Sequence, residues 1–139
     1  MHVMEALSDQ AAVQELGKLN RELLQALRQL VEPLTQSQYQ TVQAPMDSSI
    51  GAHIRHILEC YEQFARFRDS AVLSYDDRVR CQELEACPNV ALERIDWLCE
   101  ALSALQDDAP LQLNLITAHD TRLASQSSIG RELAHLIDH

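Results

Sequence analysis

Histidines occupy matching places in two similar stretches of the sequence. Residues 48–56 read SSIGAHIRH and residues 127–135 read SSIGRELAH, so the pattern of SSIG, four further residues and a histidine occurs twice. In both copies, serines that can cap a helix precede an apolar anchor, and the histidine follows about two turns later. Two packed helices of this kind would bring His56 and His135 to comparable positions.

Each of these histidines has a second histidine one helical turn away. His53 precedes His56 by three residues, and His139 follows His135 by four. Residues at these spacings are neighbours on a helix surface, where two imidazoles can supply two ligands to one divalent metal ion. A third histidine from a facing helix would complete a site with positions open for water or substrate. The spacing therefore predicts a metal site.

The same histidines also allow a purely structural interpretation. In that interpretation each imidazole lies at the border between the apolar stripe and solvent, with one nitrogen hydrogen-bonded and the other in water. The pattern leaves both interpretations open. His2 and His119 have no histidine at matching helical spacing and enter neither of them.

Composition favours helices as the elements that position these side chains. The 139 residues fit one domain, 1–139, in which 46% of the residues are hydrophobic, only 4% are aromatic and three are glycines. An all-α fold is therefore predicted, as a bundle of four helices. Apolar residues recur at steps of three and four in four stretches. These stretches predict helices over Ser8–Val31, Ser48–Phe67 and Pro88–Asp107, and from Gln126 or Ser127 onward.

Two segments of this plan are less regular. Between Pro110 and Ser125, leucines alternate with polar residues, which is typical of a strand. Because a single strand would have nothing to pair with, we interpret this segment as an ordered crossover between the third and fourth helices. The fourth helix is still running at His139 without a glycine, a basic last turn or a proline, so we expect the domain to be cut within that helix.

Charge and apolar content narrow the range of partners. The chain has 21 acidic and 11 basic residues, a formal net charge of -10, which argues against binding to nucleic acid or to anionic lipid. No stretch approaches the roughly 20 apolar residues that span a bilayer, and the N-terminus lacks the features of a signal peptide. We expect a cytoplasmic protein with reduced, mostly buried cysteines.

Three segments together resemble the DinB-like superfamily, also described as DinB/YfiT-like metalloenzymes. They are SSIGAHIRHILECYEQF at 48–64, SYDDRVR at 74–80 and SSIGRELAHLIDH at 127–139. The resemblance implies a four-helix bundle with up-down-down-up topology and a long crossover, commonly dimeric. It also implies a divalent metal such as nickel or zinc held by three histidines, one from the second helix and two from a His-xxx-His pair on the fourth.

The resemblance assigns the ligands position by position. His56 matches the histidine of the second helix, and His139 matches the first histidine of the fourth-helix pair. His135 matches a further histidine that members often carry one turn earlier. The second histidine of the pair would follow His139 by four positions, beyond the chain as given. The site in this chain would therefore use His56, His135 and His139, with His53 as a substitute for one of them, or would be empty.

The implied activity belongs to metal-dependent chemistry. The superfamily includes transferases that add a small cellular thiol to electrophiles, and hydrolases, so the resemblance implies a small-molecule substrate such as a low-molecular-weight thiol. A divalent ion with open positions lowers the pKa of a bound water or thiol, which makes the nucleophile available near neutral pH. The alternative is a non-catalytic dimeric helical module of the same fold, without a functional metal site.

Acidic and basic residues near the histidines have two interpretations each. Glu59, Glu132 and Asp138 lie on the same predicted helices as the histidines and could orient an imidazole through its second nitrogen. We interpret them instead as solvated helix acids. The SYDDRVR segment could form an anion-binding lip over the pocket, but we favour a salt-bridged turn that pins the connection between the second and third helices.

Overall fold

The computed structural model describes residues 2–42, 44–67, 72–76, 80–105, 110–116 and 122–138. Helices account for most of these residues, as predicted, but a small sheet is also present. The elements in chain order are α1 (His2–Val31), α2 (Gln36–Gln40), α3 (Ile50–Phe67), β1 (Val72–Leu73), α4 (Gln82–Ala86), α5 (Pro88–Ser103), β2 (Pro110–Ile116), β3 (Arg122–Ser128) and α6 (Ile129–Asp138).

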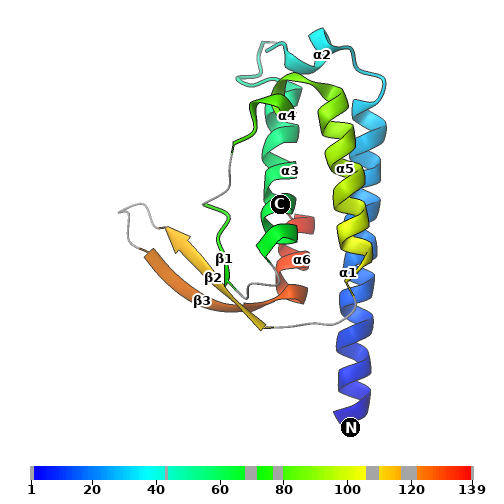
Figure 1. The fold of residues 1–139 in the computed structure, drawn as a ribbon, viewed down its shortest axis with the longest axis vertical. Helices are drawn as coiled ribbons and strands as arrows, with labels where there is room; N and C mark the ends of the chain where they lie inside the picture. The colour runs from blue at the N-terminus through cyan, green and yellow to red at the C-terminus, as the bar shows by residue number, and fades with distance from the viewer. Residues whose placement is uncertain are drawn as a thin grey trace.

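The long helices α1, α3, α5 and α6 pack against one another. Helix α1 contacts α5 and α6, and α3 contacts α5 and α6. In Figure 1, α1 and α6 run up the view while α3 and α5 run down it, so α3 and α6 are antiparallel neighbours. The short helices α2 and α4 lie at the upper end in this view, and the sheet lies beside the lower part of α3.

The core consists of the apolar stripes that the sequence predicts. Each long helix turns a row of leucine, isoleucine or valine side chains inward, and burying one such side chain contributes about 1.5–3 kcal/mol to folding. Buried members include Val13, Leu24 and Val31 of α1, Ile54, Leu58 and Phe64 of α3, Ile95, Leu98 and Leu102 of α5, and Leu133 and Leu136 of α6. The inward faces of α3, α5 and α6 follow the predicted spacing, whereas α1 exposes Leu19, Leu23 and Leu30, which the same spacing placed inward.

Both SSIG segments open a helix, as expected from the repeated pattern. Helix α3 begins at Ile50, where the Ser49 hydroxyl oxygen accepts a hydrogen bond from the Ala52 backbone N–H at 3.0 Å. Helix α6 begins at Ile129, where the Ser128 hydroxyl oxygen accepts from the Arg131 N–H at 3.2 Å. The cap is thus the second serine of each pair. The predicted starts at Ser48, and at Gln126 or Ser127, are two to three residues early.

The N-terminal helix is longer than predicted. Helix α1 already runs from His2, so Ser8 lies inside the helix and does not cap it. The residues before Ser8 include Met, Glu, Ala and Leu, which are good helix formers and let the helix continue towards the N-terminus. Helix α5 ends at Ser103, four residues before the expected Asp107.

The prediction that residues 110–125 lack a partner strand is wrong. Strand β2 pairs with β3 in antiparallel register from Pro110 opposite Ser128 to Ile116 opposite Arg122. The two-residue strand β1 adds to β2 in parallel, with Leu73 opposite Leu113. The sequence of β3, RLASQSS, is polar, and its residues 123–126 are exposed, so it carries no alternation that would mark it as a strand.

Candidate metal site

The structure places the predicted ligands unevenly. His56 lies in the middle of α3 and is half-buried, whereas His53, one turn earlier, is exposed. His135 is exposed on α6, and His139 lies outside the described residues. Within the described part of the chain, no three His, Cys, Asp or Glu side chains gather in a way that could hold a metal ion. The chemistry of the donors nevertheless fits nickel or zinc, because imidazole nitrogens suit both ions.

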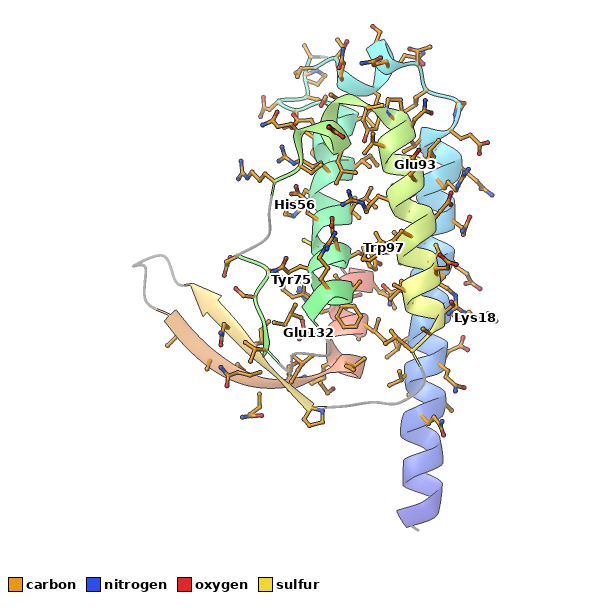
Figure 2. All side chains as sticks on the ribbon, in the orientation of Figure 1. Lys18, His56, Tyr75, Glu93, Trp97 and Glu132 are labelled. Atoms are coloured by element: carbon orange, nitrogen blue, oxygen red, sulfur yellow. The ribbon has the colours of Figure 1, made fainter. Side chains whose placement is uncertain are left out.

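The face of α3 that carries His56 borders the described chain that leads from β1 to α4, which we call the α3–α4 connection (residues 72–76 and 80–81). Glu59 Oε2 accepts a hydrogen bond from the Cys81 backbone N–H at 2.7 Å. One turn further, Gln63 Nε2 donates to the Ser74 carbonyl oxygen at 2.8 Å. Residues three, four or seven apart share one side of a helix, so His56 lies on this side as well. Figure 2 shows His56 on this flank, above Tyr75.

Glu59 also takes part in a row of ion pairs that joins α3 to α4 through Arg55. The Arg55 side chain lies between two carboxylates, with Nε 3.6 Å from Glu59 Oε1 and Nη1 2.5 Å from Glu85 Oε2. Glu59 is only 2% exposed. The interpretation of Glu59 as a solvated helix acid is therefore wrong, because its carboxylate is buried and fixes the backbone where the connection enters α4.

A second buried carboxylate fixes the connection to α6. Glu132 is 4% exposed, and its two oxygens accept hydrogen bonds from the Tyr75 hydroxyl at 2.8 Å and the Ser127 hydroxyl at 2.6 Å. The Tyr75 ring also lies against the His135 imidazole, with ring centroids 5.9 Å apart. Burial raises the pKa of Tyr75 well above its ordinary value, and the Glu132 carboxylate raises it further, so the phenol stays a donor.

These contacts correct the expected roles of the helix acids. Glu132, like Glu59, is not a solvated acid, whereas Asp138 is exposed as expected. The hydrogen bonds of Glu59 and Glu132 described above hold the connection and β3, not an imidazole. The repeated pattern could not reveal this, because Asp138 occupies the place of Glu59 in the second copy. Helical spacing could have revealed the burial of Glu132, because this residue follows Ile129 by three positions and lies on the apolar side of α6.

The SYDDRVR segment is only partly described. Its Asp77 and Arg78 lie outside the described residues, and Arg80 is exposed. The salt-bridged turn and the anion-binding lip therefore both stay predictions. Three buried polar side chains of the two helices hydrogen-bond to the described ends of the connection, namely Glu59, Gln63 and Glu132.

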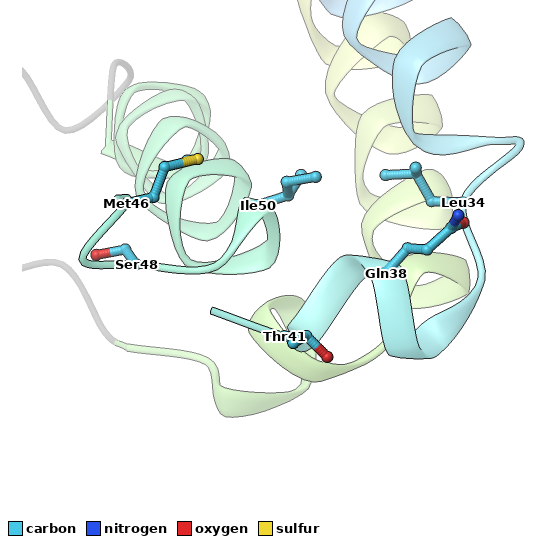
Figure 3. Close-up of a pocket in the computed structure, with 6 residues that line it drawn as sticks. All are labelled: Leu34, Gln38, Thr41, Met46, Ser48 and Ile50. Atoms are coloured by element: carbon cyan, nitrogen blue, oxygen red, sulfur yellow. The ribbon is translucent and has the colours of Figure 1, made fainter. Parts of the chain in front are cut away.

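Two pockets lie away from the connection. An apolar pocket of about 180 Å³ lies between α1, α3 and α6, and its lining includes Ile57, Tyr61, Leu136 and Ile137. Another, of about 200 Å³, lies at the α2 end of the molecule (Figure 3) and is lined by Leu34, Gln38, Thr41, Met46, Ser48 and Ile50. The first pocket shows that the segment of α3 just after His56 meets the last turn of α6.

None of the four cysteines, all of which lie in the described part of the chain, takes part in a disulfide bond. Cys60 is buried, and Cys81, Cys87 and Cys99 are half-buried. Burial raises the pKa of the Cys99 thiol, so a smaller fraction of this thiol is ionised to the reactive thiolate. Of the helices that the structure describes, not one combines the length and the apolar character needed to cross a membrane.

Comparison with known proteins identifies the family. Neither a curated protein nor a solved structure matches this chain. The family model described as the DinB superfamily matches residues 19–139, which include both SSIG segments and the α3–α4 connection. The resemblance of these segments is thereby confirmed, and the chain belongs to the DinB superfamily.

Proposed function

We propose that this protein is a metal-dependent enzyme of the thiol transferase or hydrolase type. His56, His135 and His139 are the proposed ligands of a nickel or zinc ion, with His53 as a substitute for one of them. The proposed substrate is a small molecule, and a low-molecular-weight thiol fits the transferase type. We place the enzyme in the cytoplasm.

This proposal depends on the contact between the segment of α3 that follows His56 and the segment of α6 that precedes His139. Ile57, which directly follows His56, lines the same apolar pocket as Ile137, which precedes His139 by two residues. Helices α3 and α6 contact each other and run in opposite directions (Figure 1). The end of α6 therefore lies at the level of His56. His135, one turn back, faces the same connection that the His56 side of α3 borders.

The directions of the helices also support the proposed topology. With α1 and α6 running one way and α3 and α5 the other (Figure 1), we propose the up-down-down-up bundle. The β2–β3 hairpin occupies the long crossover between α5 and α6. In this arrangement α3 and α6 supply ligands from opposite directions to one site between them.

The side chains of the protein itself would prepare this site. When bound, a divalent ion lowers the pKa of a water or thiol on its open position, which supplies a nucleophile near neutral pH. The buried carboxylates Glu59 and Glu132 keep the connection against α3 and α6. One side of His56 and of His135 thereby borders the connection, and the other side is left for the approach of substrate.

Replacing His56 by alanine tests this proposal. Loss of a direct ligand should lower zinc affinity by more than the roughly 10- to 100-fold that follows loss of an outer partner. Calorimetric zinc titration of the untagged protein measures this. His2→Ala is the control, because His2 has no second histidine at helical spacing and is not among the proposed ligands. Unchanged zinc affinity in His56→Ala, with the fold intact by circular dichroism, would contradict the proposed site.

The alternative is a non-catalytic module that dimerises through an apolar helix face. In its favour, Leu19, Leu23 and Leu30 of α1 are 39%, 46% and 68% exposed and follow one another at helical spacing. In this case His56→Ala would leave both the assembly and the thermal stability unchanged in the presence and absence of zinc. Sedimentation equilibrium of the two proteins, combined with the zinc titration, distinguishes the module from the enzyme.

A further inference from the structure

Tyr75 connects the α3–α4 connection to the proposed metal ligand on α6. Its hydroxyl donates to Glu132 Oε1 at 2.8 Å, and its ring lies against the His135 imidazole with centroids 5.9 Å apart and planes tilted by 44°. Glu132 and His135 are three residues apart, so they lie on the same side of α6. The tyrosine therefore contacts one side of α6 at two points, the Glu132 carboxylate and the His135 ring.

The position of Tyr75 is determined by buried groups. Glu132 is 4% exposed, and its second oxygen accepts the Ser127 hydroxyl, so the carboxylate has little freedom to move. On the other side, the carbonyl of the neighbouring Ser74 accepts a hydrogen bond from Gln63, which is 8% exposed on α3. Because both anchors come from packed helices, the ring has a fixed place relative to α6.

From this geometry we infer that Tyr75 is a positioning residue for His135, and that Glu132 holds the tyrosine in place. The ring limits the rotation of the exposed imidazole on the side of the connection, so the imidazole is directed before any ion arrives. Preorganised ligands bind a metal more tightly because less freedom is lost on binding. The benefit for metal binding rests on the proposed function, whereas the positioning itself is a property of the metal-free protein.

Two variants separate the hydroxyl from the carboxylate that accepts it. Tyr75→Phe keeps the ring but removes the hydrogen bond, and Glu132→Ala removes the acceptor. Both should shift the NMR signals of the His135 ring, identified by their loss in His135→Gln, and both should lower zinc affinity about tenfold. Glu132→Gln keeps an oxygen that accepts from Tyr75 and should restore both readouts towards those of the unmodified protein.

Tyr39→Phe is the matched control. Tyr39 is also buried, and its hydroxyl donates to the Leu84 carbonyl near α4. This variant loses a buried hydroxyl and some stability, but it should leave the His135 signals and zinc affinity unchanged. Thermal unfolding of each variant confirms that the comparisons are made between folded proteins.

The outcomes are distinguishable. Unchanged His135 signals in Tyr75→Phe and Glu132→Ala would overturn the positioning role, and so would shifts of the same size in Tyr39→Phe. Shifted signals with unchanged affinity, in a protein that binds zinc, would also overturn it. If the unmodified protein binds no zinc, the proposed function fails, and the NMR comparison alone then decides whether Tyr75 positions His135.

Discussion

Replacing Gly51 by alanine should destabilise the protein by about 3 kcal/mol, a large value for the addition of one methyl group. Gly51 lies in the first turn of α3, where the helix passes very close to α4. A Cβ atom at this position would overlap the backbone carbonyl oxygen of Glu85 and lie 2.8 Å from a ring carbon of Tyr39. Because the first obstacle is backbone, α3 and α4 would have to move apart.

Gly17→Ala provides the control for this prediction. Gly17 is also buried in a helix, but a Cβ atom there would meet its nearest neighbour, the Leu102 carbonyl oxygen, at an ordinary 3.6 Å. Alanine in a helix interior is favoured over glycine by about 0.5–1 kcal/mol, so this variant should be more stable. Urea unfolding followed by circular dichroism measures both. Equal midpoints for Gly51→Ala and the unmodified protein would show that the close approach of α3 and α4 is wrong.

Replacing Glu59 by alanine should also cost about 3 kcal/mol, because it leaves a largely buried arginine without one of its partners. The Arg55 side chain is only 16% exposed, and Glu85 would remain as its partner. The backbone N–H of Cys81 would lose its acceptor as well. Glu59→Gln should cost roughly half as much, since the amide oxygen still accepts that hydrogen bond.

Glu93→Ala is the control for the carboxylate. Glu93 is an exposed acid on α5, and removal of a solvated surface acid changes stability by no more than about 0.5 kcal/mol. Urea unfolding of the three variants gives the comparison. If Glu59→Ala unfolds at the same urea concentration as Glu93→Ala, the carboxylate of Glu59 does not hold the connection.

The helices and their inward faces were predictable because local sequence determines them. The spacing of Ile54, Leu98 and Leu133 with their neighbours places each on an inward stripe without reference to the rest of the chain. The starts of α3, α5 and α6 were predictable to within three residues, whereas α1 begins six residues before the expected Ser8. Both SSIG segments offer two adjacent serines, and only the backbone geometry of the preceding loop or strand decides which serine forms the cap.

The sheet and the buried acids were not predictable in this way. Strand β3 is formed through its backbone pairing with β2, and the side chains of β3 itself carry no apolar alternation that would mark it as a strand. Glu59 and Glu132 are buried because the connection supplies Cys81 and Tyr75 as hydrogen-bond donors. A carboxylate can be buried only when such donors are present. Here both donors lie far from the acid in the sequence, so the local pattern around each acid does not reveal them.

The residues of the candidate site were predictable only in part. The echo of SSIG and histidine correctly places His56 and His135 on two helices that contact each other. It could not place Tyr75, whose contact with His135 depends on the path of the connection between α3 and α4. The part of the site that depends on helix periodicity was therefore visible in the sequence, and the part that depends on the connection was not.

The zinc and nickel content of the untagged protein after equilibrium dialysis, followed by elemental analysis, tests the proposed function most directly. We predict one ion bound per chain, with the bound ion lost in a protein that carries both His56→Ala and His135→Ala. Dialysis that leaves no zinc or nickel on the unmodified protein, or the same amount on the double variant, would contradict a metal centre on α3 and α6.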